Sequence, residues 1–304
     1  MWRTIIISSG EKITVKDSWL IVKASNNEVK VPISDIYALV IENRAASISV
    51  STITSLNNQG AHIIYCNEQH IPSAISLPLN NHYRPYNVLK KQLAMDKNFK
   101  DYIWQKIIMQ KICNQALCLK YVGVKKDKVD DLFALSKNVK CGDSSNREAV
   151  ASKKYFTYLF GSTFRRSDNE ITNHALNYGY SIIRSCVAKT LCAYGFNGTL
   201  GLHHINESNP FNLADDIMEP LRPIVDLWVD NNEMDLFETL TYMNRKSLIN
   251  LVNCEILIGG KVMRVQNAID VYVKSFSSCI ESNDVQLLVL PELLKENYIY
   301  IENE

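Results

Sequence analysis

The chain has 304 residues, 46% of them hydrophobic and 21% charged, and its formal net charge is +1. That apolar content is ample for a hydrophobic core, either in one large domain or in two ordinary ones. The N-terminus has no charged-then-apolar export signal and no apolar run long enough to span a bilayer, so the cytoplasm is the default location. We expect a folded, soluble, cytoplasmic protein without a membrane partner.

The eight cysteines do not form a recognisable framework. They are scattered through a large chain, no two have CxxC spacing, and most have apolar neighbours. Buried, reduced thiols are therefore preferred over a zinc site or a set of disulfides.

The first 80 or so residues have the pattern of β-strands. Short apolar or alternating runs occur at residues 4–7, 19–22, 29–32, 36–41 and 62–66. Turn signals at Ser9-Gly10-Glu11 and Ser25-Asn26-Asn27 predict antiparallel hairpins, and a short helix is expected with Ser51 or Thr52 as its cap. We predict a β domain over residues 1–79, with residues 80–86 as the linker.

From residue 87 onward the apolar period is that of helices. An apolar stripe from Trp104 to Leu119 predicts a helix of about 30 residues, and further helices are expected to begin near Ser145, Asn173 and Asn212. The fold class is therefore α+β by domain: a small N-terminal, mainly antiparallel β domain followed by a larger all-α C-terminal domain, residues 87–304.

Charge is distributed unevenly along the chain. Residues 84–126 hold ten Lys/Arg against two acids, residues 205–238 hold nine acids against one arginine, and residues 281–304 hold six acids against one lysine. A basic helical segment followed by an acidic one fits a phosphate-binding surface beside a cation site. Lysines that merely solvate one helix face would give the same counts, and charge alone favours that simpler interpretation.

The acidic region holds two carboxylates at helical spacing. Asp216 and Glu219 are three residues apart, so both project from one face of a helix, for which Asn212 is the expected cap. Such a concentration of negative charge is unfavourable unless a cation neutralises it, which favours a bound metal. Pro220 and Pro223 are expected to kink the helix just after Glu219.

A histidine and a further glutamate precede this region. His204 lies in the loop Gly201-Leu202-His203-His204, and spacing alone does not distinguish it from His203. Glu148 falls in the first turn of an expected helix, where a capping or dipole role is the simplest interpretation. Together, two carboxylates and an imidazole suit Mg²⁺ or Mn²⁺ better than structural zinc, and such cations serve phosphoryl chemistry on nucleic-acid strands.

Several motifs, in order along nearly the whole chain, resemble one family. They are Asn146-Arg147-Glu148 with Tyr155-Phe156, the run from Asn173 to Tyr180, the loop from Gly201 to His204, and the run from Asp216 to Asp226. These motifs resemble the Cas1 family of CRISPR-associated spacer integrases and endonucleases, most closely its type II-A version.

The resemblance implies an enzyme of bacterial CRISPR adaptation and antiviral defence. Such an enzyme joins a double-stranded prespacer to the leader-repeat DNA of the array, each 3′-hydroxyl attacking a phosphodiester in a metal-dependent transesterification. The implied catalytic residues and metal ligands are Glu148, His204 and Glu219, with Mg²⁺ or Mn²⁺ as cofactor. His204 is chosen because it occupies the histidine of the family's Gly-Leu-x-His pattern. Asp216 matches an acidic position of second rank near the metal.

Partners follow from the same resemblance. It implies a homodimer formed through the β domain, and two dimers flanking a dimer of the small protein Cas2 in a heterohexamer, with Cas9 and a type II-A accessory protein as further partners. Candidate nucleic-acid contacts are Arg84, Lys154 and Arg222, although pairing with the carboxylates is the preferred role of Arg222. Lys154 stands where relatives often have arginine, and Glu219 where many have aspartate. A metal-dependent nuclease without strand joining and a non-catalytic DNA-binding scaffold stay open as alternatives.

Overall fold

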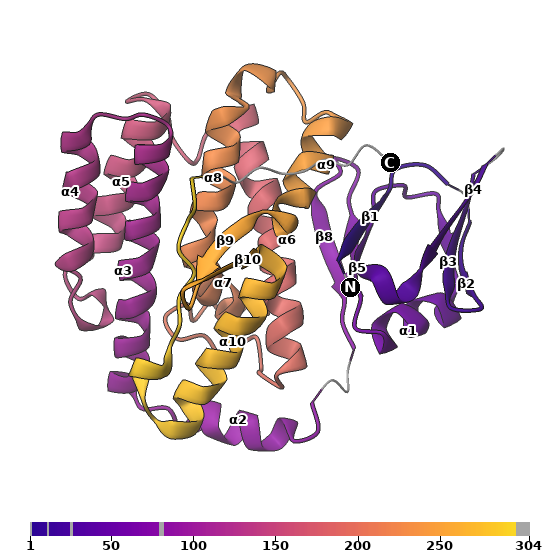
Figure 1. Ribbon diagram of the computed structural model, residues 1–304, viewed down its shortest axis with the longest axis horizontal. Coiled ribbons are helices and arrows are strands. Elements are labelled where there is room, and N and C mark those ends of the chain that lie inside the picture. Colours follow the sequence, from indigo (N-terminus) through magenta and orange to yellow (C-terminus); the bar gives the residue numbers. More distant parts are fainter. Residues whose placement is uncertain (1, 11, 25–26, 79–81, 296–304) are drawn as a thin grey trace. The chain divides into compact units, whose positions relative to one another are not determined.

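The computed structural model describes residues 2–10, 12–24, 27–78 and 82–295, and the chain divides into two compact units, Met1–Tyr83 and Arg84–Glu304 (Figure 1). This division falls within the expected linker, whose residues 80 and 81 lie outside the described residues, as do residues 296–304 of the acidic C-terminal segment. A strand-rich unit followed by a mostly helical one confirms the predicted fold class. None of the described helices is long and apolar enough to cross a membrane.

Within the described residues, the N-terminal unit contains two four-stranded sheets. Their strand orders are β1-β5-β7-β8 and β4-β3-β2-β6. The strands are β1 Arg3–Ile7, β2 Lys12–Lys16, β3 Trp19–Ala24, β4 Asn27–Pro32, β5 Ile36–Ile41, β6 Ser47–Ile48, β7 His62–Cys66 and β8 Pro72–Ser76. Helix α1 (Val50–Asn58) connects β6 to β7, and its N-cap is Ser49 rather than Ser51 or Thr52.

Strand directions differ in part from the expectation of a mainly antiparallel domain. β5 pairs in parallel with both β1 and β7, whereas the pairs β2–β3, β3–β4 and β7–β8 are antiparallel. The β3–β4 hairpin is confirmed, although residues 25 and 26 of its turn lie outside the described residues. The hairpin predicted at Ser9-Gly10-Glu11 is wrong, because β1 and β2 belong to different sheets. Parallel partners are distant in sequence, so turn signals do not reveal them.

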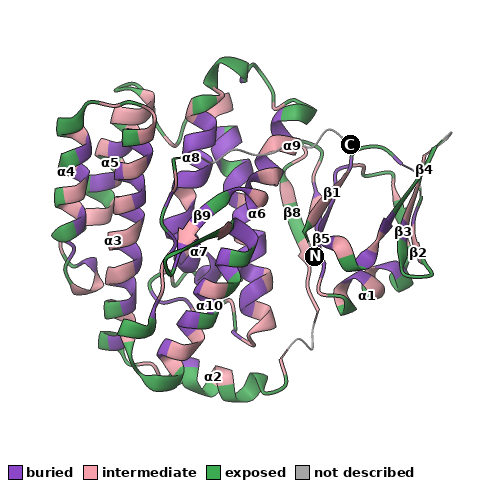
Figure 2. Cartoon of the chain, viewed as in Figure 1, coloured by how far each residue is buried: buried purple, intermediate pink, exposed green. Residues whose placement is uncertain are grey.

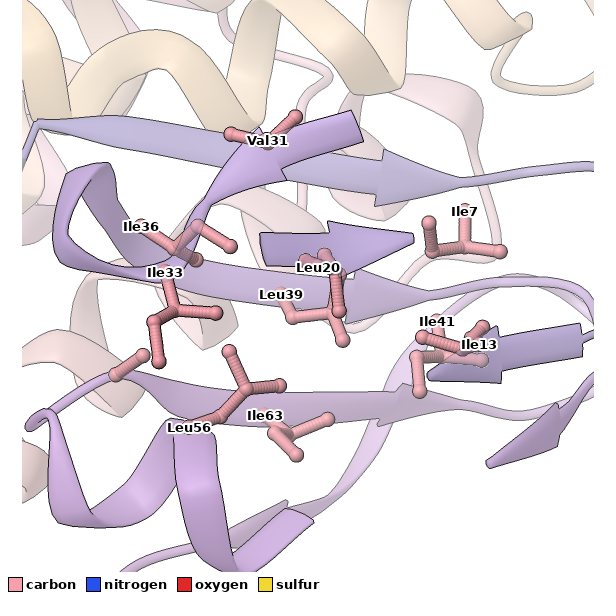
Figure 3. Packing of buried hydrophobic residues seen from close by; sticks show 11 residues of the cluster. Ile7, Ile13, Leu20, Val31, Ile33, Ile36, Leu39, Ile41, Leu56 and Ile63 are labelled. Atoms are coloured by element: carbon pink, nitrogen blue, oxygen red, sulfur yellow. The ribbon is translucent and has the colours of Figure 1, made fainter. Parts of the chain in front are cut away.

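The two sheets of this unit share one apolar core (Figure 3). Leu39 and Ile63 come from the first sheet, Ile13 and Leu20 from the second, and Leu56 from α1. All five side chains are completely buried. Because strand side chains alternate between faces, each sheet supplies one apolar face to this core.

The C-terminal unit consists mainly of helices. They are α2 Pro85–Ala94, α3 Lys97–Tyr121, α4 Lys126–Lys137, α5 Arg147–Phe160, α6 Ile171–Ala193, α7 Asn212–Met218, α8 Arg222–Asn231, α9 Tyr242–Asn250 and α10 Val265–Ser282. Helices α3, α4 and α5 lie side by side, and α6 packs against α7, α8 and α10 (Figure 1). Buried residues follow α3 and α6 along most of their length (Figure 2). The unit is not all-α, because β9 (Glu255–Ile258) and β10 (Lys261–Arg264) form an antiparallel hairpin.

The apolar stripe from Trp104 to Leu119 lies within one helix, α3, which has 25 residues rather than the predicted 30 or so. Helix α2 ends at Ala94, and α3 begins at Lys97 after an extended Met95. Asp96 is the N-cap of α3, where its Oδ1 accepts a hydrogen bond of 2.8 Å from the backbone N–H of Phe99. A cap of this type starts a new helix without interrupting the apolar pattern, so periodicity alone does not reveal the break.

The helix expected to hold both carboxylates is also interrupted. Helix α7 ends at Met218, and a 3-10 turn, η3 (Glu219–Leu221), leads into α8. Asp216 therefore lies in α7, and Glu219 lies in η3. Asn212 is the first residue of α7 rather than its cap, and its amide donates to carbonyl oxygens of the preceding loop. The break comes just before Pro220, one residue earlier than predicted.

Replacing Leu39 with alanine is expected to destabilise the N-terminal unit by about 2–5 kcal/mol, because a cavity would remain in the core that the two sheets share. Denaturant unfolding followed by circular dichroism measures this loss. Val29→Ala, at a strand position 57% exposed, is the control and should change stability by less than about 0.5 kcal/mol. Equal losses in the two variants would contradict this assignment of the core.

Candidate active site

Glu148 lies at the start of α5, where a neighbouring acid holds the helix terminus. Asp143, in the 3-10 turn η2 (Cys141–Asp143), accepts hydrogen bonds from the backbone N–H groups of Arg147 (2.8 Å) and Glu148 (2.9 Å). A carboxylate here satisfies N–H groups that the helix leaves unpaired and complements its positive end. Because Asp143 takes this role, the Glu148 side chain does not cap α5 and is directed to α3 instead.

Lys111 of α3 joins Glu148 to Glu219. Its Nζ donates to Oε1 of Glu148 at 2.6 Å and lies 2.6 Å from Oε2 of Glu219. The Lys111 side chain is only 8% exposed, and that of Glu219 is 4% exposed. Burial alone lowers the pKa of Lys111, but attraction to Glu219 and Glu148 raises it above its ordinary value. The side chain is therefore a buried ammonium ion shared by two carboxylates from different elements.

Glu219 is fully ionised despite its burial. Burial by itself would raise its pKa, but the positive charges of Arg222 and Lys111 outweigh this effect and lower the pKa to about 2. Arg222, one turn further along the chain, donates from Nε to Oε1 of Glu219 at 3.0 Å. The guanidinium of Arg222 also lies over the ring of Tyr180, 4.7 Å from its centroid. Arg222 thus holds one oxygen of Glu219, and Lys111 contacts the other.

Asp216 organises the loop that carries the two histidines. Its side chain is completely buried and accepts hydrogen bonds from the backbone N–H groups of Leu202 (2.6 Å), His203 (3.1 Å) and His204 (3.2 Å). Its Oδ1 also contacts Nδ1 of the His204 ring at 2.6 Å. A Cβ atom at Gly201 would collide with the carbonyl oxygen of His204 and with the Asp216 carboxylate, so only glycine allows this tight turn. Asp216 therefore fixes both the backbone and the ring of His204.

The two histidines differ in their surroundings. The ring of His203 stacks on Trp104 with centroids 4.4 Å apart and planes 3° apart, whereas His204 meets Trp104 edge-on at 6.0 Å. The hydrogen bond with Asp216 raises the pKa of His204 above its ordinary value, against the opposing effect of burial. Its charge in turn contributes to lowering the pKa of Glu219. Because Nδ1 of His204 is held by Asp216, Nε2 is the ring atom that could bind a ligand.

A third buried carboxylate, Asp226, holds residues next to Arg222. Asp226 of α8 accepts a hydrogen bond of 3.0 Å from the hydroxyl of Tyr155 and a shorter one from the hydroxyl of Tyr180. Burial raises the pKa of Asp226 to about 6, although both tyrosine hydrogen bonds act in the opposite direction. Tyr180 also contacts Arg222, so Asp226, Tyr180, Arg222 and Glu219 form a continuous polar chain.

The structure brings together some of the candidate residues and separates others. Glu148 and Glu219 meet at Lys111, and Asp216 holds His204. Lys154, a candidate nucleic-acid contact, lies in an ion pair of 2.7 Å with Asp131 of α4. Arg84, another candidate, immediately precedes α2. Sequence reasoning missed Lys111, which counted only as one of ten basic residues in its segment.

A divalent cation requires several oxygen or nitrogen donors close together. Within the described ranges, no three His, Cys, Asp or Glu side chains are grouped closely enough to hold a metal ion. Two donors nevertheless converge, because one oxygen each of Glu148 and Glu219 contacts the same cationic nitrogen. Oε2 of Glu219 is buried, and its contact with Lys111 lacks the angles of a hydrogen bond. Carboxylates and imidazoles are donor types that divalent cations accept, but here the ammonium of Lys111 lies between the two carboxylates.

Comparison with known proteins identifies the family. Residues 4–232 match the family model described as CRISPR associated protein Cas1. The chain belongs to the Cas1 family. It is 38% identical over 300 residues to the CRISPR-associated endonuclease Cas1 of Neisseria meningitidis serogroup C (strain 8013), covering 96% of this chain and 97% of that protein. It is 26% identical over 236 residues to the CRISPR-associated endonuclease Cas1 2 of Saccharolobus solfataricus, covering 74% and 73% of the two chains.

Solved structures share the fold of this Cas1-family chain. A casposase bound to its integration product matches with a TM-score of 0.71 at 20% identity, covering 97% of this chain and 96% of the casposase. A Cas1 protein from Thermotoga maritima matches with a TM-score of 0.69 at 15% identity, covering 92% of this chain and 97% of that one. A Cas6-RT-Cas1–Cas2 complex matches with a TM-score of 0.73 at 17% identity over 97% of this chain and 36% of the matched chain.

Replacing Asp216 with asparagine is expected to lower the pKa of His204 toward its ordinary value, because the charged partner of the ring is removed. The stabilisation from this pair is fully present below the unfolded pKa of about 6.5 and is lost as pH rises through the raised folded-state pKa. NMR titration of metal-free protein measures the shift. Glu207→Gln, at an exposed position in the same loop, is the control and should leave the pKa of His204 unchanged. An unaltered pKa in Asp216→Asn would contradict the pairing.

Proposed function

We propose that this chain is the DNA integrase and endonuclease of CRISPR adaptation, which inserts prespacer DNA into a repeat array by 3′-hydroxyl transesterification. The observation that carries this proposal is the convergence of Glu148 and Glu219, from separate elements, on a single cationic atom in a Cas1-family chain. A site that gathers two carboxylates around one cation suits chemistry at a phosphodiester, where a cation offsets charge.

Glu148, His204 and Glu219 are the proposed catalytic residues and ligands of Mg²⁺ or Mn²⁺. Such a cation polarises the scissile phosphate and stabilises the leaving oxygen. The residues around it have separate tasks. Asp216 holds Nδ1 of His204, which fixes the ring with Nε2 as the proposed donor atom. Arg222 keeps Glu219 ionised and holds one of its oxygens, and Asp143 places Glu148 at the end of α5.

This assignment leaves Asp216 outside the proposed ligand set. Both of its oxygens are engaged by the loop of residues 202–204, which gives it four donors. His203 is not a proposed ligand either, because its ring is stacked on Trp104. His204 is therefore preferred on its contact with Asp216 as well as on its place in the Gly-Leu-x-His pattern.

The proposed substrate is double-stranded DNA, both prespacer and leader-repeat, and the proposed partner is Cas2. The casposase bound to an integration product and the complex containing Cas1 and Cas2, both of the same fold, support these two assignments. We also propose that the chain forms a homodimer through its N-terminal unit, residues 1–79, and a heterohexamer with Cas2. Contacts with Cas9 and an accessory protein, the type II-A subtype and a bacterial cytoplasmic location stay predictions of the sequence resemblance.

Glu148→Gln is expected to abolish joining of a prespacer to a repeat-containing plasmid, lowering its rate by at least about 100-fold, because one carboxylate of the site loses its charge. The assay follows a labelled prespacer 3′ end into plasmid DNA in the presence of Cas2 and Mn²⁺ or Mg²⁺. Glu233→Gln, an equivalent change at an exposed position, is the control and should join DNA at the unaltered rate.

The same assay separates the alternative functions. Cut DNA without any labelled joint would indicate a nuclease that does not join strands. A non-catalytic DNA-binding scaffold would bind DNA equally well with chelator and with metal. It would neither cut nor join DNA with any divalent cation. Unimpaired joining by Glu148→Gln, with the same dependence on metal, would overturn the role given to this residue.

Lys154→Gln tests the proposed contact with the DNA backbone. If Lys154 neutralises one phosphate, the change weakens prespacer binding and lowers the slope of log K against log salt concentration by about 1. The measurement is fluorescence anisotropy at several salt concentrations. An unchanged slope would assign Lys154 only to its ion pair with Asp131.

A further inference from the structure

Lys111 is a charged residue on the buried face of α3. Its neighbours Ile107, Ile108 and Ile112 on the same helix are completely buried, and Lys111 itself is 6% exposed. A buried ammonium ion is unfavourable unless opposite charges surround it. Glu148 and Glu219 supply those charges, each with an oxygen 2.6 Å from Nζ. The ammonium therefore occupies the position where a cation shared by the two carboxylates would bind.

The charges of this cluster already balance without a metal. Glu148 and Glu219 carry two negative charges, and Lys111 and Arg222 carry two positive charges, while the neighbouring carboxylate of Asp216 is paired with the ring of His204. A divalent cation added to this set would face two fixed positive charges at short range in a buried setting. One of the two cationic side chains must therefore give up its contacts when such an ion binds.

Lys111 is the cation that can leave, because Arg222 is anchored on two sides. The guanidinium of Arg222 donates to Oε1 of Glu219 and lies over Tyr180, whose hydroxyl binds Asp226. Lys111 contacts Oε2 of Glu219 without hydrogen-bond geometry. Its charge stands at the end of a flexible four-carbon chain. Oε2 of Glu219 and Oε1 of Glu148 are the oxygens that its departure would free.

We propose that Lys111 is a built-in counter-ion that holds the two carboxylates together in the metal-free protein and that a divalent cation displaces it. The inference rests on the proposed function, because it takes Glu148 and Glu219 as ligands of that cation. Lys111 is then a positioning residue that sets metal affinity: it stabilises the empty site, and it competes with the metal for the same oxygens.

The test compares Lys111→Met with Lys120→Met, which removes the same charge from the exposed end of α3. Binding of Mn²⁺ to the full-length protein is measured by the loss of the free-ion signal in electron paramagnetic resonance. Lys111→Met is expected to lower the Kd for Mn²⁺ by about tenfold or more, since the competitor is gone. In the presence of a chelator, the thermal unfolding midpoint of Lys111→Met should lie about 5 °C or more below that of wild type. Saturating Mn²⁺ should restore this midpoint toward the wild-type value. Lys120→Met should match wild type in both measurements.

Lys111→Gln provides a second variant if Lys111→Met does not fold, because its amide can still donate to the carboxylates while carrying no charge. It too is expected to bind Mn²⁺ more tightly than wild type. If wild type binds Mn²⁺ and the neutral variants bind it no more tightly, the displacement is wrong while the metal site stands. If neither wild type nor any variant binds Mn²⁺, the proposed metal site is wrong as well. Binding by the neutral variants but not by wild type would support the displacement in its strongest form.

Discussion

Two carboxylates that meet in a buried place repel each other, and the site in the C-terminal unit depends on the cations that hold them together. Glu148 comes from the start of α5 and Glu219 from the turn η3, and each contacts the ammonium of Lys111. Arg222 adds a second positive charge and, with Lys111, keeps the pKa of Glu219 at about 2 despite burial. Without these cations, burial would raise the pKa of Glu219 above its ordinary value.

Three other buried acids of this unit have structural tasks outside the cluster. Asp143 caps α5, Asp216 holds the backbone and ring of His204, and Asp226 accepts hydrogen bonds from two tyrosines. Asp143 and Asp216 thereby orient Glu148 and His204, and Asp226 holds Tyr180, whose ring lies under Arg222. The interrupted helix between α7 and α8 is part of the same arrangement, since it lets Asp216 serve the histidine loop while Glu219 contacts Lys111. The N-terminal unit, with its own apolar core, is built independently of these charges.

Patterns of neighbouring residues in the sequence predicted the structural features that depend on contacts between those neighbours. Strand β7, the position of Glu148 at a helix start and an interruption next to Pro220 could be predicted in this way, although the helix ends one residue earlier than expected. Three other features were not predicted. The parallel pairing of β5 with β1 and β7 joins distant segments, and the break before α3 is made by a cap, Asp96, within an unbroken apolar pattern. Lys111 interrupts a buried apolar stripe, which is a visible signal, but the sequence does not say which carboxylates it meets.

The most direct test is a crystal structure of the protein soaked in Mn²⁺, with the ion located by its anomalous scattering. The account predicts one Mn²⁺ bound by Glu148, Glu219 and Nε2 of His204. Asp216 should still accept its hydrogen bonds from residues 202–204. Nζ of Lys111 should no longer lie between the two carboxylates. Binding of the ion by Asp216 or His203 would contradict the account. A structure at saturating Mn²⁺ in which Lys111 still lies between Glu148 and Glu219 would also contradict it.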